Sequence, residues 1–292
     1  MGGRLSLRER LIDPKSPDRR PRKSAYALPA LFTAGNLFLG FIAILQAFEG
    51  ALHVGRGEFG HNSHFEIAAM LIGISVFLDG LDGRIARLTN TASEFGKELD
   101  SLADVISFGI APAVLAWACG FYFMDPTMPP ELRKQLMQAG YFVVFMFVMC
   151  GAARLARFNI TTNPVPRNPG RPDRKYFVGL PIPAGAGMIA AAVYAAGSEP
   201  IVNWHISVAF LALVALLAFL MVSTWRYRSF KDFSLVRPRS PFSVVLIGGF
   251  FYAIWNYSQP VLLGLAVMYV SSGMLVRFGG IIKRRFFRRA TA

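Results

Sequence analysis

Four aspartates stand in two pairs whose spacing is that of neighbours on a helix. Asp79 and Asp82 are three residues apart, and Asp100 and Asp104 are four apart. Either spacing puts both members of a pair on one face of an α-helix. Both pairs lie in apolar segments, where each carboxylate costs about 2.5–3.5 kcal/mol on membrane-insertion scales. Four carboxylates brought together there would also repel one another, so we expect divalent cations to neutralise them.

The ligand type narrows the chemistry of this site. Carboxylate oxygens suit Mg²⁺ or Mn²⁺ and argue against zinc or copper. Two acid-bearing helices that face each other resemble a two-metal site for phosphoryl chemistry. The alternative is a structural role, in which the acids form salt bridges with Arg84, Arg87 and Lys97. These cations are too few for four acids and lie partly at the interface, so the metal site is favoured.

The composition indicates which elements carry these acids. The chain has 292 residues and a formal charge of +14, with 54% hydrophobic and 16% charged residues. Soluble domains carry about 25% charged residues, and disordered chains are far less hydrophobic. The two cysteines exclude a disulfide scaffold, and no C-x-x-C motif is present. A polytopic membrane protein with basic edges is the class that remains.

Apolar segments recur along the chain at nearly even spacing, most of them long enough to cross a 30 Å hydrocarbon core. They predict an all-α membrane helix bundle of about eight transmembrane helices. The expected spans are 27–48, 65–88, 97–121, 136–157, 179–197, 205–224, 241–256 and 259–279. The last two form a tight hairpin, since Asn256 to Pro260 reads as a turn. Pro181 and Pro183 are compatible with a broken helix at a cavity or with a plain helix start.

The distribution of Lys and Arg predicts the orientation of this bundle. With eight spans and a cytoplasmic N-terminus, 28 of the 31 basic residues fall on the inner side. The outer side keeps Arg56, Arg133 and Lys134. Cytoplasmic loops are enriched in Lys and Arg, so both termini and the acid-bearing helix ends are expected to face the cytoplasm.

The acids belong to a longer pattern that also fixes small residues and an arginine. It reads Asp79-x2-Asp82-Gly83-x2-Ala86-Arg87-x8-Gly96-x3-Asp100-x3-Asp104. All eight fixed positions match the signature of the CDP-alcohol phosphatidyltransferase family, which the chain therefore resembles. A chance match at a given start is on the order of 10⁻¹⁰ at ordinary residue usage. The glycines alone would also fit close helix packing.

The resemblance implies a membrane enzyme that holds two divalent metals, Mg²⁺ or Mn²⁺, and binds a CDP-linked lipid. Its phosphatidyl group would pass to an alcohol, releasing CMP, in a homodimer of the bacterial inner membrane. It implies metal ligands at Asp79, Asp82 and Asp100, and at Asp104 a ligand that also takes the alcohol proton. Contacts with the cytidine diphosphate are implied for Gly83, Arg87 and Ser93. The domain layout would be a basic tail (1–26), a six-helix core (27–224), two additional helices (225–279) and a second basic tail (280–292).

Further segments resemble the branch of this family that uses L-serine, the bacterial phosphatidylserine synthases. They surround Asn36, Asp104, Arg157 and Pro181 and together cover about residues 27–200. CDP-diacylglycerol and L-serine would then be the substrates. Arg154 or Arg157 would hold the serine carboxylate, although either could instead be a positive-inside anchor that reaches lipid phosphates.

Other functions stay open at this point. Within the family, the acceptor could be glycerol 3-phosphate, inositol 3-phosphate or choline, and the basic stretch from Arg154 to Lys175 would suit a phosphorylated one. A cation transporter would spread its acids along a path and show paired halves, whereas these acids cluster at one depth and no internal repeat is evident. His61 and His64 lie in an outer loop, where a solvated loop is a better interpretation than a metal site.

Overall fold

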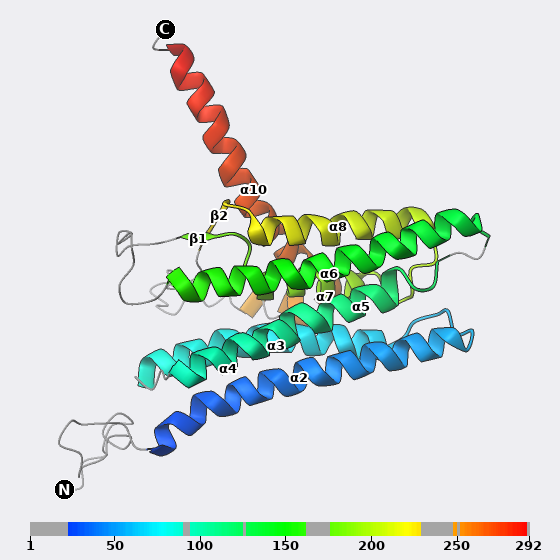
Figure 1. The fold of residues 1–292 in the computed structure, drawn as a ribbon, viewed down its shortest axis with the longest axis horizontal. Helices are drawn as coiled ribbons and strands as arrows, with labels where there is room; N and C mark the ends of the chain where they lie inside the picture. Colours follow the sequence, from blue (N-terminus) through cyan, green and yellow to red (C-terminus); the bar gives the residue numbers. More distant parts are fainter. Residues whose placement is uncertain are drawn as a thin grey trace, which may run out of the picture.

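The computed structural model describes residues 23–89, 94–124, 127–161, 176–228, 248–249 and 252–290. Within those ranges the chain is a bundle of long helices that lie side by side (Figure 1). In chain order the elements are α2 (Lys23–Gly55), α3 (Ser63–Thr89), α4 (Glu94–Asp104), the π-helix η1 (Val105–Ile110), α5 (Ala111–Gly120), α6 (Pro130–Thr161), β1 (Tyr176–Val178), α7 (Ile182–Ala195), α8 (Trp204–Val222), β2 (Arg226–Arg228) and α10 (Ser258–Ala290).

Membrane-length helices dominate this architecture, which confirms the predicted all-α membrane bundle. Six described helices are long and apolar enough to cross a membrane. They span Ala30–Gly55, Ser63–Leu81, Phe95–Gly120, Pro130–Ile160, Trp204–Val222 and Ser258–Leu275. The expected span at 241–256 lies largely outside the described residues, so the count of eight stays a prediction.

The fifth expected span is shorter than the apolar run 179–197 suggested. Helix α7 begins only at Ile182 and has 14 residues, which correspond to about 21 Å at 1.5 Å per residue. Gly179 has a φ of +82° and Pro181 is extended, so the backbone before Ile182 cannot continue the helix. Pro183 lies in the first turn of α7, where a missing N–H does no harm. Of the two interpretations of these prolines, the plain helix start agrees with this geometry.

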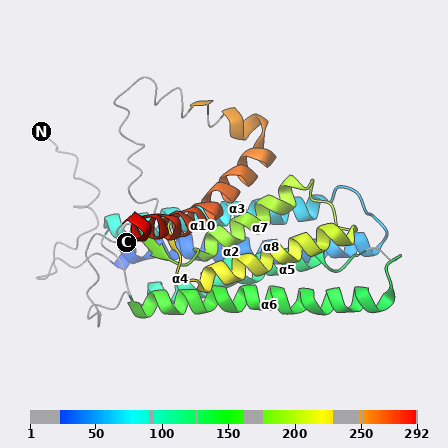
Figure 2. The same cartoon turned by 90° about the horizontal axis from the view of Figure 1, so that it is seen from above.

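Helix α7 occupies the middle of the bundle. It packs against α3, α10, α5 and α8, and Ile182, Ala186 and Ile189 are fully buried. Small residues such as Gly185 and Ala186 allow neighbouring helices to approach its backbone. Figure 2 shows the same helices from above, with α6 along one edge and α7 among the others.

The third span contains a feature that the sequence pattern did not predict. Between α4 and α5 the backbone forms a π-helix, η1, directly after Asp104. Ser107, Phe108 and Gly109 of this segment are buried. π-Helical turns inside α-helices often occur at functional sites, because they alter the direction of the side chains around them.

Two short strands, separated in the chain by α7 and α8, pair at the end of the bundle where α6 and α8 finish. β1 and β2 run antiparallel, with Phe177 opposite Tyr227. Helix α10 packs on β2 and on α7, and a Cβ at Gly273 would lie 2.3 Å from the Tyr227 ring. α10 continues to Ala290, so the predicted tail 280–292 is mostly helical backbone, and it points away from the bundle in Figure 1.

Candidate active site

Three of the four predicted metal ligands meet at one point of the structure. Asp79 lies on α3, and Asp100 and Asp104 lie on α4. Each offers a carboxylate oxygen, and these oxygens all lie within 4.8 Å of one another. Asp79 and Asp100 are half-buried, and Asp104 is 8% exposed. Helices α3 and α4 therefore bring their acid-bearing faces together, as the spacing predicted.

The donor set of this cluster fits a hard divalent cation. The three ligand atoms are carboxylate oxygens from two helices, and such oxygens are the ligands of Mg²⁺ and Mn²⁺. Among the described residues this is the only group of three acids, histidines or cysteines close enough to share an ion. Three carboxylates at this distance, largely shielded from water, would be unfavourable without a cation or a proton between them.

The structure describes the remaining motif residues only in part. Asp82, Gly83 and Arg87 belong to the last turns of α3. The surroundings of their side chains, and the whole of Ser93, lie outside the described residues. On the backbone, Asp82 is three residues after Asp79, which keeps it on the face that carries the cluster.

Arg154 brings a positive charge next to the cluster. It lies on α6, is 8% exposed, and its guanidinium carbon is 5.7 Å from the centre of the Phe158 ring. Its charge interacts with the carboxylates of Asp104 and Asp79 and with Tyr269 of α10. A buried guanidinium beside several carboxylates supplies fixed donors that can hold a further anion.

Arg157 is positioned differently, although it is only one turn further along α6. Its guanidinium donates to the main-chain carbonyls of Val222 at 3.3 Å and Val178 at 3.4 Å. It also packs against Gly179, where a Cβ would lie 3.1 Å from Nη2 and 2.4 Å from the Met221 carbonyl oxygen. Arg157 of α6 therefore ties the end of α8 to the end of β1.

A contact that the motif did not predict holds α4 against α6. Asn159 donates from Nδ2 to Ser101 Oγ at 2.9 Å, and Ser101 donates to the Lys97 carbonyl at 3.0 Å. Ser101 directly follows Asp100 in the chain, so this contact fixes the turn of α4 that carries an acid. The only sequence signal was the position of Asn159 after the two arginines of α6.

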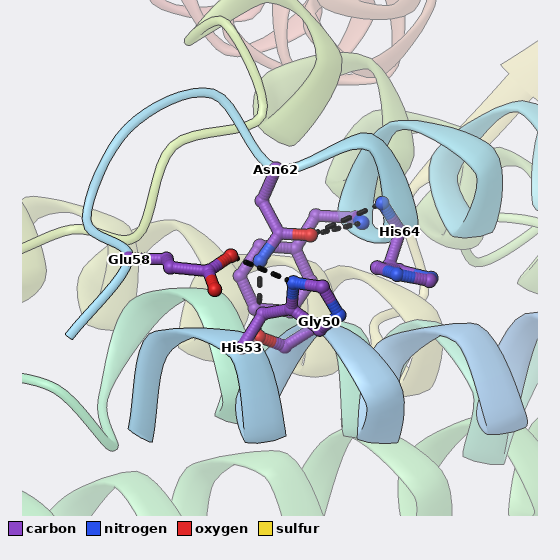
Figure 3. Close-up of polar contacts among 6 residues, drawn as sticks. Gly50, His53, Glu58, Asn62 and His64 are labelled. Atoms are coloured by element: carbon purple, nitrogen blue, oxygen red, sulfur yellow. Dashed lines mark hydrogen bonds and ion pairs between the residues drawn. The ribbon is translucent and has the colours of Figure 1, made fainter. Parts of the chain in front are cut away.

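The outer end of the bundle holds the histidines. His53 Nδ1 lies 2.8 Å from Glu58 Oε2, and the His53 and His64 ring centres are 4.6 Å apart. Figure 3 shows these residues around Asn62, whose Nδ2 donates to the Gly50 carbonyl at 3.0 Å. His61 Nδ1 donates to the Gly197 carbonyl at 2.8 Å. His61 thus links the loop before α3 to the segment after α7, whereas His64, which the sequence placed in a loop, lies in the first turn of α3.

Comparison with known proteins shows which family the chain belongs to. The sequence profile of the CDP-alcohol phosphatidyltransferases matches residues 26–225. The chain belongs to this family. The match ends before α10, so that helix lies outside the shared domain.

Similar proteins include several with one shared name, CDP-diacylglycerol–serine O-phosphatidyltransferase. The protein of that name from Helicobacter pylori (strain ATCC 700392 / 26695) is 39% identical over 211 residues, which cover 72% of this chain and 76% of the relative. The one from Saccharomyces cerevisiae is 39% identical over 159 residues, 54% of this chain and 50% of its own length. The one from Methanocaldococcus jannaschii is 38% identical over 162 residues, covering 56% and 64%.

Proposed function

We propose that this membrane protein transfers the phosphatidyl group of CDP-diacylglycerol to L-serine, giving phosphatidylserine and CMP. The observation that carries the proposal is the cluster of Asp79, Asp100 and Asp104, with the buried guanidinium of Arg154 beside it. The cluster suits a cation-bound pyrophosphate, and the guanidinium suits the carboxylate of an amino acid. The names and the 39% identity of relatives in this family support the serine acceptor.

The metal ligands of this reaction would be Asp79, Asp82, Asp100 and Asp104, holding two divalent cations. Their oxygen atoms favour Mg²⁺ or Mn²⁺. The chemistry that such cations supply is stabilisation of the negative charge that develops on the phosphate oxygens as CMP departs.

Asp104 is the proposed general base. The serine hydroxyl oxygen attacks the phosphorus that bears diacylglycerol, and the bond between that phosphorus and the CMP oxygen breaks. CMP leaves with the bonding electron pair, and the hydroxyl proton passes to the Asp104 carboxylate. Asp104 is the most buried of the three described acids, which keeps water from competing with the serine hydroxyl at this position.

Substrate contacts are divided between two regions. Gly83, Arg87 and Ser93 are proposed to bind the cytidine diphosphate, as the family resemblance implies. For the serine carboxylate we favour Arg154 over Arg157, because Arg157 already donates to the carbonyls of Val222 and Val178. The guanidinium of Arg154 can offer two parallel N–H donors to a carboxylate, a geometry that lysine lacks.

The site is proposed to face the cytoplasm of a bacterial inner membrane, since 28 of 31 basic residues fall on that side of an eight-span topology. A tag placed after Ala292 should then be protected from reagents that label only the periplasmic side of intact cells. Labelling of that tag would contradict the topology. A homodimer is expected from the family resemblance, and crosslinking in native membranes tests it.

A CMP-release assay tests the acceptor. Purified protein receives CDP-diacylglycerol, Mn²⁺ and one acceptor at a time: L-serine, glycerol 3-phosphate, inositol 3-phosphate or choline. Serine should give the fastest release, with phosphatidylserine as the lipid product. Faster release with glycerol 3-phosphate at equal concentration would refute the serine assignment and leave only the family reaction.

A further inference from the structure

A buried polar contact joins three elements next to the carboxylate cluster. Asn36 of α2, Ser75 of α3 and Ser107 of η1 are all fully buried. Ser75 Oγ donates to Asn36 Oδ1. Ser107 Oγ donates to the main-chain carbonyl oxygen of Asn36 at 3.0 Å. One residue of α2 therefore accepts hydrogen bonds from both of the other elements.

Each of the two serines lies close in the chain to an acid of the cluster. Ser75 precedes Asp79 by four residues on α3, a spacing that places both on the same face. Ser107 follows Asp104 by three residues, at the point where α4 passes into the π-helix. Asn36 is thus linked to α3 and to the α4–η1 junction within about one turn of the carboxylates that must meet.

Packing brings the same elements into close contact. A Cβ at Gly40 of α2 would lie 2.4 Å from Ser107 Oγ and 2.7 Å from its Cα. The missing side chain at Gly40 therefore permits the close approach of η1 to α2. Gly35, on the same helix, has nothing within 4 Å of its Cβ position.

Stability alone does not explain an asparagine at this position. Within the part of the chain that the structure describes, the buried Nδ2 of Asn36 has no hydrogen-bond partner. A buried donor without an acceptor costs about 1–3 kcal/mol, whereas apolar residues of similar shape at such a contact can be neutral or stabilising. A polar group kept at such a cost points to a role in geometry.

We propose that Asn36 is a positioning residue for the metal site. By holding Ser75 and Ser107, it fixes the spacing between α3 and the end of α4, and so the approach of Asp79 to Asp104. This inference rests on the proposed metal role of the cluster. It assigns to α2, which carries none of the four motif acids, a part in forming the site.

The test is Mn²⁺ binding by the full-length protein in detergent, followed by the electron paramagnetic resonance signal of free Mn²⁺. Asn36→Ala and Ser75→Ala should each raise the apparent Kd about tenfold or more, the range seen when groups behind metal ligands are removed. Ser75→Thr keeps the hydroxyl and should stay near the wild-type affinity.

Two controls separate positioning from general destabilisation. Asn62→Ala removes a buried asparagine contact at the other end of the α2–α3 pair and should leave the Mn²⁺ Kd unchanged. Gly40→Ala should weaken Mn²⁺ binding by pushing η1 from α2, while Gly35→Ala should not. The Ser75 variants keep the inference testable if Asn36→Ala does not fold.

The outcomes are distinguishable. Wild-type binding of Mn²⁺ with unchanged affinity in both Asn36→Ala and Ser75→Ala overturns the inference and leaves the proposed function standing. A Ser75→Thr variant as weak as Ser75→Ala also overturns it. A wild-type protein that binds no Mn²⁺ overturns the inference and the metal site together.

Discussion

The acidic side chains at the two ends of the α2–α3 pair have different neighbours. At the outer end two acids have histidine neighbours. Glu58 lies 2.8 Å from His53 (Figure 3), and Glu66 lies 3.1 Å from His61. At the inner end three carboxylates gather within 4.8 Å of one another. The outer end pairs the Glu58 and Glu66 carboxylates one to one with imidazole rings, as a structural link does. The inner end gathers three carboxylates in a shielded place beside Arg154, an arrangement that would be unfavourable without a cation or a proton between them.

The two ends also differ in how a buried asparagine is hydrogen-bonded, as Asn62 and Asn36 show. Asn62 Oδ1 accepts from the amide of His64 at 3.0 Å and its Nδ2 donates to the Gly50 carbonyl, so both ends of its amide are used. Asn36 uses its oxygen for Ser75 and leaves its Nδ2 without a described partner. A satisfied amide stabilises a helix start, whereas an incompletely satisfied one is retained where position matters more than stability.

Metal removal should produce the largest difference between the two ends. EDTA should abolish CMP release, and added Mn²⁺ or Mg²⁺ should restore it, because the inner acids need a cation. Asp79→Asn should lose at least about a hundredfold in turnover, since an amide is a poorer ligand than a carboxylate. Glu66→Gln, at the outer end, should keep wild-type turnover. Full activity in EDTA would remove the metal from the mechanism.

The next effect concerns the acceptor. Arg154→Lys should raise the KM for serine about tenfold and leave the KM for CDP-diacylglycerol within about twofold, because the paired donors to the carboxylate are lost. Arg157→Lys is the matched control on the same helix and should change the serine KM less. Steady-state kinetics with each substrate varied in turn measures both. Equal serine KM values in wild type and Arg154→Lys would move the carboxylate contact elsewhere.

A smaller effect is expected for Asn62→Ala. The variant loses the side-chain acceptor for the first turn of α3, worth about 1–2 kcal/mol of unfolding free energy. Thermal unfolding in detergent should show a lower midpoint, while both KM values stay unchanged. A large change in serine KM would mean that the outer end influences the site, against the division described above.

The smallest effect is a pH dependence at the outer end. The hydrogen bond to the Gly197 carbonyl, and next the nearby Glu66 carboxylate, raise the pKa of His61 above its ordinary value. Folding then favours the protonated ring. This contribution is complete below about pH 6.5, the value for an unperturbed histidine, and is lost as the pH rises through the raised folded value.

His61→Gln removes this contribution. The difference in unfolding midpoint between wild type and His61→Gln should therefore be larger at pH 5.5 than at pH 8.5. A difference that grows with pH would contradict the assigned sign.

The clustering of Asp79, Asp100 and Asp104 was predictable from sequence because it depends on local spacing. Helical periods place Asp79 with Asp82 and Asp100 with Asp104, and a short reversal joins the two faces. The different surroundings of Arg154 and Arg157 were not predictable, since the carbonyls that accept from Arg157 belong to residues 65 and 21 positions away. The π-helix after Asp104 was equally hidden. The π-helix accompanies the close approach of Gly40 on α2 to Ser107. This contact cannot be predicted from the residues of the third span alone.

The central claim is that the inner carboxylates carry the chemistry, with Asp104 taking the proton from the serine hydroxyl. Its most direct test is CMP release by Asp104→Asn at saturating Mn²⁺, CDP-diacylglycerol and L-serine. An amide cannot accept the proton, so turnover should fall by about 10²–10⁴-fold while the thermal unfolding midpoint stays close to that of the wild type. Turnover within about tenfold of the wild type in that variant would contradict the claim.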